Sequence, residues 1–121
     1  MALVIVTLTL SISAYTPGAN RISGGDIMAN GAAPHWGAFA CPASIQLGAR
    51  VELLGDVAER AASMGLPTSG ICADRMHRAY SARHLDICIP QDHDGLNNAQ
   101  RLMWAYQWGR RRGSVRFTIQ R

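Results

Sequence analysis

Apolar and polar residues alternate along the first part of the chain. From residue 7 to residue 14 every second residue is apolar, and the residues between are threonine or serine. A period of two is typical of a half-buried β-strand, so we expect a strand over Leu3–Tyr15 that ends at the turn residues Pro17 and Gly18. The alternation and the shortness of the uninterrupted apolar run, Leu3–Val6, argue against a signal peptide, as does the lack of a preceding positive charge.

Short apolar runs later in the chain predict further strands. Each run is four to six residues long and is bounded by glycine, proline or polar residues. The expected strands are Ala38–Cys41, Arg50–Leu54, Ser69–Ala73, His84–Ile89 and Ser114–Ile119. Five or six short strands joined by irregular loops favour a small β-barrel or an α+β domain over a doubly wound parallel sheet.

Two segments have helical spacing. Asp56 and Glu59 have the spacing of a capping box and Gly65 suits a helix C-terminus, so a short helix is expected between them. A second helix is expected to begin after Asp92 or Asp94, either of which suits an N-cap, and to end at Gly109. Its predicted buried face consists of Leu96, Ala99, Leu102, Met103 and Tyr106.

Composition limits the class of protein. The 121 residues suit one domain over 1–121, and no apolar run is long enough to cross a bilayer. The net charge is +4, and all twelve positive side chains are arginine. A modest basic excess suits an anionic partner such as nucleic acid or an acidic wall polymer, or it keeps a surface solvated. The run Arg110–Arg112 is short and lacks interleaved aromatic residues, which disfavours nucleic acid.

Two aspartates are the strongest candidates for chemistry. Asp74 and Asp86 each lie two residues from a cysteine, Cys72 and Cys88, so each pair shares one face of its strand. If the two strands pair antiparallel with Asp74 opposite Asp86, then Cys72 faces Cys88. These two thiols could form a disulfide in an oxidising compartment, or they could both be buried core residues. Two close carboxylates raise one pKa and create the proton donor that glycosidic cleavage requires.

Other interpretations of these residues stay open. Both aspartates could instead make turn contacts or ion pairs with Arg75, Arg78 or Arg83. The histidines His77 and His84 fit no established metal-ligand spacing with Cys72, and surface histidines are the simpler interpretation. Among the tryptophans, Trp104 and Trp108 are expected to pack against the core, whereas the loop residue Trp36 is the better candidate for ligand contact.

The order of short motifs resembles the 3D domain family, named for three aspartates. That family has a double-psi β-barrel fold and is related to the C-terminal part of membrane-bound lytic transglycosylase A, and more distantly to rare lipoprotein A and expansin barrels. The resemblance spans Ser13 to Ile119. The stretches that carry it are Ala14–Pro17, Ala29–Gly31, Ser44–Gly48 with Val51, Ile71–Asp74, Leu85–Ile87, and Ala105–Arg111 followed by Val115.

The resemblance implies a six-stranded double-psi barrel with one or two short helices, acting on peptidoglycan glycan strands without metal or cofactor. An aspartate at the position of Asp74 or Asp86 would serve as general acid and then base, and the sugar's own hydroxyl would close a 1,6-anhydro ring. Tyr15, Asn30 and Trp36 would contact the substrate. Such a protein would work in the cell envelope or outside the cell, or would be encoded by a bacteriophage and carried in the particle or released at lysis.

Three departures from the family pattern support a second hypothesis. The first family aspartate falls at Cys41, the proline of the family's I-P-L-G element is Gln46, and Arg75 replaces the residue that leads into a glycine turn. A barrel with these changes could bind cell wall or build a bacteriophage particle without catalysing a reaction. The sequence leaves the oligomeric state open.

Overall fold

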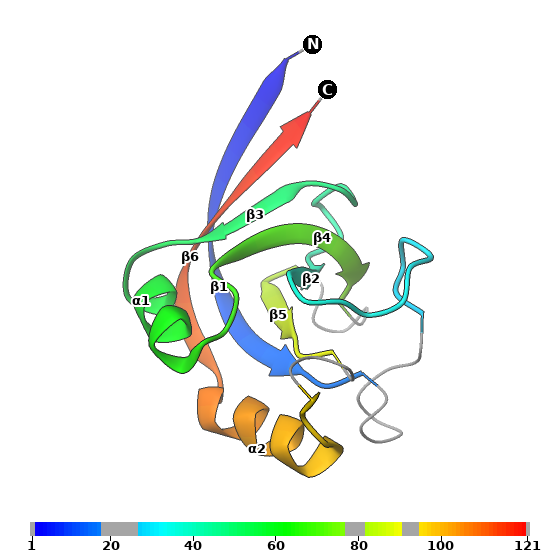
Figure 1. The fold of residues 1–121 in the computed structure, drawn as a ribbon. Helices are drawn as coiled ribbons and strands as arrows, with labels where there is room; N and C mark the ends of the chain where they lie inside the picture. Colours follow the sequence, from blue (N-terminus) through cyan, green and yellow to red (C-terminus); the bar gives the residue numbers. More distant parts are fainter. Residues whose placement is uncertain (1, 18–26, 77–81, 91–94, 121) are drawn as a thin grey trace.

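The computed structural model describes residues 2–17, 27–76, 82–90 and 95–120. Six strands close into a barrel in the order β1-β5-β2-β4-β3-β6, and two short helices pack beside it (Figure 1). The elements are β1 (Leu3–Tyr15), β2 (Ala38–Cys41), β3 (Arg50–Leu53), α1 (Gly55–Met64), β4 (Ser69–Arg75), β5 (His84–Cys88), α2 (Asn98–Trp108) and β6 (Arg111–Gln120). The prediction of a mainly β barrel with two short helices is confirmed.

The strand pairing is mixed. β1 pairs parallel with β5, and β2 pairs parallel with β4, while the other four pairs around the barrel are antiparallel. The predicted antiparallel pairing of β4 with β5 is wrong, because β2 lies between them. The local pattern identified both strands but carried no information about which strand would separate them.

Beyond the barrel, β1 and β6 continue as a two-stranded ribbon. The register runs from Leu3 opposite Gln120 to Ile12 opposite Arg111, so both ends of the chain lie together at the tip of the ribbon (Figure 1). Along β1 the even-numbered residues face the core, and Leu10 and Ile12 are fully buried there. This is the period of two that the sequence shows.

Helix α1 begins differently from its prediction but ends at the predicted residue. Its N-cap is Leu54, which makes no side-chain cap, and Asp56 lies inside the first turn, so the predicted capping box is wrong. The C-terminus is confirmed, because Gly65 adopts the left-handed conformation (φ 74°) and its N–H bonds back to the helix. Val57 packs against Gly113 of β6, where only a glycine leaves room.

Helix α2 buries a face that the sequence pattern did not predict. Arg101 and Trp108 are fully buried and Trp104 is half-buried, whereas Met103 is 56% and Tyr106 83% exposed. The predicted apolar face is therefore wrong. Its N-cap is Asn97, whose side chain forms a capping box with Gln100, while Asp92 and Asp94 lie outside the described residues.

The polar atoms on the buried face of α2 explain this orientation. The Trp108 Nε1–H donates to the carbonyl of Ile12 (3.0 Å), and the Arg101 guanidinium donates to the carbonyls of Pro17 (2.6 Å) and Ile89 (2.8 Å). A long polar side chain can be buried when all its donors find acceptors. These bonds join α2 to the ends of β1 and β5.

In the described part of the chain, no helix is long and apolar enough to cross a membrane.

Candidate functional site

The two candidate aspartates lie on either side of the same residue of β2. Ala40 is in register with Asp74 of β4 and with Asp86 of β5. Residues in register point to the same face of a sheet, so both carboxyls lie on one face with only the Ala40 methyl between them. Two strand spacings separate their Cα atoms, roughly 10 Å. The structure therefore brings the two acids together through β2 rather than by direct pairing.

A β-bulge puts Asp74 on this face. Phe39 pairs with Cys72, but the next residue of β2, Ala40, pairs with Asp74, so Ala73 is an extra residue in β4. Without the extra residue, Ala40 would pair with Ala73, and Asp74 would point to the opposite face. The bulge is a structural feature that the residue types did not reveal.

Three donors hold the carboxylate of Asp74. Its Oδ2 accepts a hydrogen bond from the Tyr15 hydroxyl (3.1 Å), and its Oδ1 accepts from the backbone N–H groups of Ala29 (3.0 Å) and Arg75 (2.9 Å). Hydrogen bonds to a carboxylate are about twice as strong as those between neutral groups. Asp74 is therefore fixed in position, with its negative charge directed at the outer face of the barrel.

The Tyr15 side chain packs over a cluster of small side chains and reaches Asp74 with its hydroxyl. It is in register with Cys88 and packs on Ala38, Ala73 and Cys88. Burial, together with the nearby Cys88 and Asp74, raises the pKa of Tyr15 far above its usual range, so its hydroxyl stays a donor. Burial also raises the pKa of the Cys88 thiol to about 11, which keeps it neutral near pH 7.

Asp86 has a different environment. In the part of the chain that the structure describes, no hydrogen bond reaches its half-buried carboxyl. Burial raises the pKa of Asp86 from 3.8 to about 6, Arg110 lowers it and Asp74 raises it further. Because a carboxyl with a pKa near 6 keeps its proton in mildly acidic solution, Asp86 is equipped to donate a proton while Asp74 provides a fixed charge.

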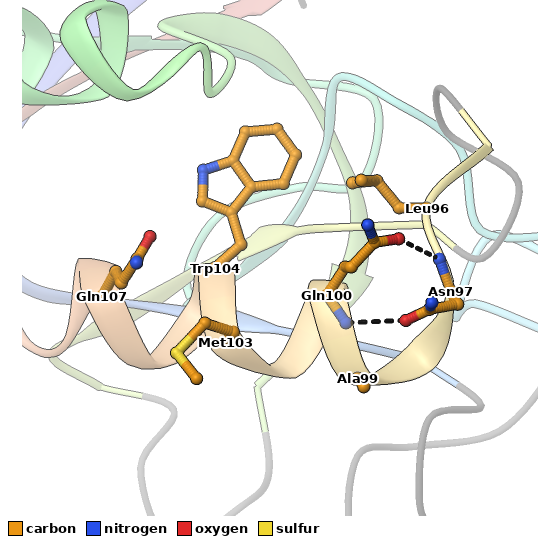
Figure 2. Close-up of a pocket in the computed structure, with 7 residues that line it drawn as sticks. All are labelled: Leu96, Asn97, Ala99, Gln100, Met103, Trp104 and Gln107. Carbon is orange, nitrogen blue, oxygen red and sulfur yellow. Dashed lines mark hydrogen bonds between the residues drawn. The ribbon is translucent and has the colours of Figure 1, made fainter.

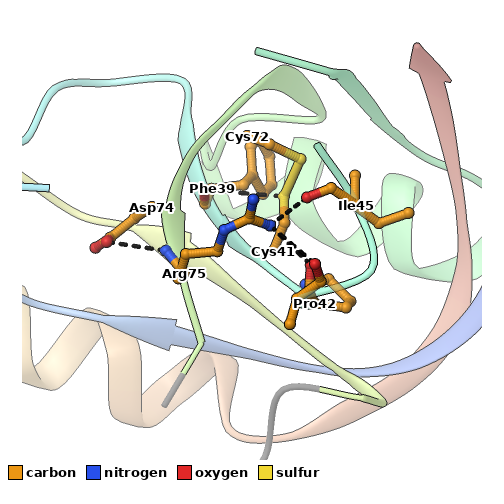
Figure 3. Close-up of a disulfide and its surroundings, with 8 residues drawn as sticks. Phe39, Cys41, Pro42, Ile45, Cys72, Asp74 and Arg75 are labelled. Atoms are coloured by element: carbon orange, nitrogen blue, oxygen red, sulfur yellow. Dashed lines mark hydrogen bonds between the residues drawn. A yellow bond between two sulfur atoms is a disulfide. The ribbon is translucent and has the colours of Figure 1, made fainter. Parts of the chain in front are cut away.

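The side chain of Arg75 turns away from the acid pair. Its guanidinium donates to the carbonyls of Pro42 (3.2 Å) and Ile45, on the other side of β4 from the Asp74 carboxylate (Figure 3). The alternative that Arg75 neutralises Asp74 by an ion pair is therefore not what the structure shows. Arg75 instead holds the loop after β2 against β4.

The disulfide joins different cysteines from those predicted. Cys41 of β2 is bonded to Cys72 of β4, with their Cα atoms 5.6 Å apart (Figure 3). Cys88 is a buried free thiol. The predicted Cys72–Cys88 bond is wrong because β2 separates β4 from β5. Cys41 and Cys72 point into the main core, whereas Cys88 lies under Tyr15 on the outer face.

The remaining predicted site residues take two positions. Asn30 lies in the turn beside Asp74, where its N–H donates to the Ala73 carbonyl (3.0 Å) and its side chain accepts from the N–H of Ala32 (3.0 Å). Trp36 instead stacks on Trp104 of α2, with ring centroids 5.8 Å apart. Contact of Asn30, Trp36 or Tyr15 with a substrate stays a prediction.

One hollow of the described surface lies away from the acid pair. It has a volume of about 420 Å³ and runs along α2, where Met103 points outward and the ring of Trp104 points toward the barrel (Figure 2). The acid pair instead occupies a half-buried strip of the barrel's outer face. No group of three metal-ligating side chains forms among the described residues, and His77 lies outside them.

The strip contains residues that the sequence interpretation did not select. Ser13 of β1 is in register with Asp86 on the side away from Ala40, and Arg110 is near enough to act on the charge of Asp86. Ser13 has no local sequence signal, and Arg110 stood out only as part of a basic run and of the family resemblance. Each joins the site through the tertiary fold. No protein-family model matches the chain, and no curated protein matches it.

Proposed function

We propose that this chain cleaves the glycan strands of peptidoglycan by lytic transglycosylase chemistry, with Asp86 as the proton donor. The observation that carries the proposal is the unequal pair on one face of the barrel: Asp86 has a pKa of about 6, and Asp74 is held by three hydrogen bonds. The closed six-stranded mixed barrel is compatible with the double-psi barrel of the 3D domain family. The motifs around both aspartates add to this support.

The reaction requires only one group that moves a proton. Asp86 would protonate the glycosidic oxygen, and the bond from that oxygen to the anomeric carbon would break with its electron pair leaving on the oxygen. The 6-hydroxyl oxygen of the same N-acetylmuramic acid would bond to the anomeric carbon and return its proton to Asp86. No water is consumed, and Asp86 ends the cycle protonated.

Asp74 has an electrostatic role in this scheme. The transition state of glycosidic cleavage carries positive charge on the sugar ring, and a negative carboxylate on the same face stabilises it. The hydrogen bond from Tyr15 keeps that carboxylate in place (3.1 Å), so Tyr15 is a positioning residue as well as a candidate contact. The negative charge of Asp74 also helps to keep the proton on Asp86.

Digestion of purified peptidoglycan tests the proposal. Wild type should release muropeptides with a 1,6-anhydro end, each lighter by one water than a hydrolysis product in mass spectrometry. Asp86→Asn should abolish release because the amide is far too weak an acid to protonate the glycosidic oxygen, and Asp74→Asn should reduce it. Asp56→Asn is the matched control, since Asp56 is exposed in the first turn of α1. Equal release by all four proteins would contradict the proposal.

One observation favours a non-catalytic barrel as the second candidate. Cys41 takes the position of the first family aspartate and is bonded to Cys72, so no third acid can act there. A barrel of this kind would bind cell wall or form part of a bacteriophage particle. Co-sedimentation with peptidoglycan that is unchanged in Asp74→Asn and Asp86→Asn, with no release of fragments, would support this candidate.

A further inference from the structure

The row of residues that contains the acid pair continues toward a positive charge. Asp86 is in register with Ser13 of β1. On the other side of β1, Ile12 is opposite Arg111, the first residue of β6. Arg110 directly precedes that strand and is close enough to Asp86 to act on its charge. The outer face therefore carries Asp74, Ala40, Asp86 and Ser13 in one transverse row, and Arg110 lies near Asp86 at the start of β6.

The three consecutive arginines do not share one role. Arg111 is held in place, because its Nε–H donates to the Trp108 carbonyl (3.0 Å) and its guanidinium lies over the Trp108 ring at 5.6 Å. Arg110 is exposed, and it follows Gly109, whose positive φ of 72° redirects the chain at the end of α2. Arg112, opposite Ser11, is also exposed.

Charge is distributed unequally about Asp86. Within the described residues, the charged groups that act on it are Arg110, which lowers its pKa, and Asp74, which raises it. Asp74 lies two strands away on the β2 side, and Arg110, which directly precedes β6, lies on the β1 side. A substrate bound over Asp86 therefore meets a negative field at one end and a positive field at the other, and its anionic groups are favoured at the arginine end.

We propose that Arg110 forms an anion subsite that binds a carboxylate of the stem peptide on the sugar next to the scissile bond. The subsite rests on the proposed function, since it assigns an orientation to the glycan strand over Asp86. Ser13 is the small side chain between the two groups, so it leaves the path from Asp86 to Arg110 open. Binding a carboxylate at Arg110 would also offset the effect of that cation on Asp86 and strengthen its hold on the proton.

A pair of ligands that differ only in charge tests the subsite. The probe is N-acetylmuramoyl-L-alanyl-D-glutamate, compared with the same compound carrying both carboxylates as amides, in NMR titrations of the whole chain. Wild type should bind the charged form more tightly, by up to roughly fivefold, which is the upper end of the range for an exposed ion pair. The preference should weaken as salt is added. An equal affinity for both forms would overturn the proposal.

Three variants separate this subsite from general charge. Arg110→Gln should lose the preference, and Arg110→Lys should keep most of it. Arg60→Gln is the matched control, because Arg60 is exposed on α1, and it should behave as wild type does. A preference that persists in Arg110→Gln, with an unchanged melting temperature, would refute the assignment.

The subsite and the proposed function can fail separately. If wild type releases no anhydro products from peptidoglycan but still shows the Arg110-dependent preference, then the cleavage proposal is wrong and the subsite stands. If wild type cleaves peptidoglycan while Arg110→Gln leaves the relative KM for charged and amidated strands unchanged, then the subsite is wrong and the cleavage proposal stands.

Discussion

Breaking the bond between Cys41 and Cys72 should destabilise the protein strongly. The two residues are 31 apart in sequence, and closing a loop of that length removes roughly 12 cal/mol/K of entropy from the unfolded chain. This corresponds to about 3.7 kcal/mol at 25 °C. A chain of 121 residues has an unfolding entropy of about 250 cal/mol/K, so the melting temperature should fall by about 15 °C.

Differential scanning calorimetry measures this difference. Wild type is compared in its oxidised form and after reduction with a phosphine, with a thiol count confirming three free cysteines in the reduced sample. Cys88→Ala is the control, since it removes a buried sulfur without removing a cross-link, and its own melting temperature should still fall on reduction. An unchanged melting temperature in the fully reduced protein would refute the reasoning, as would a peptide map that links Cys72 to Cys88.

Three further changes have defined outcomes. Burial raises the pKa of Asp86 to about 6, so the free energy of unfolding of wild type falls as pH rises toward that value. Asp86→Asn should therefore be more stable than wild type by about 2–3 kcal/mol near pH 8. The difference should disappear below about pH 4, where the carboxyl is protonated in both the folded and the unfolded chain. Tyr15→Phe should lower the unfolding free energy in urea by about 1.5–3 kcal/mol, since the carboxylate of Asp74 loses a donor. Gly70→Ala should prevent cooperative thermal unfolding, because its methyl would overlap the backbone oxygen of Gly37.

The local elements of this fold could be predicted from the sequence because each has a local cause. The alternation of apolar and polar residues predicted β1 with its observed bounds, Leu3–Tyr15. Gly65 and Gly109 predicted both helix C-termini. These features depend on the backbone preferences of a few neighbouring residues, and those preferences can be predicted from the residue types.

The pairing of distant strands could not be predicted in the same way. Nothing near Asp74 or Asp86 indicates that β2 lies between their strands, so the register and the disulfide derived from it were wrong. The two aspartates still lie on one face of the barrel, because Ala40 is in register with both of them. The bulge at Ala73, which puts Asp74 on the same face as Asp86, also depends on tertiary structure alone.

The face of α2 was mispredicted for a different reason. The pattern treated Met103 and Tyr106 as core residues and arginine as a surface residue. In the structure the guanidinium of Arg101 finds carbonyl acceptors at Pro17 and Ile89, and the residue is fully buried. Whether a polar side chain can be buried depends on acceptors elsewhere in the chain, and a hydrophobic pattern contains no such information.

A pH titration of the Asp86 carboxyl by ¹³C NMR tests the central claim most directly, because the proposed reaction depends on a proton donor at that position. We expect an apparent pKa of about 6 in wild type, with a lower value in Asp74→Asn, where the neighbouring negative charge is gone. Arg110→Gln should shift the pKa the other way. A wild-type value close to 3.8, unchanged in both variants, would show that the barrel holds no such donor and would contradict the account.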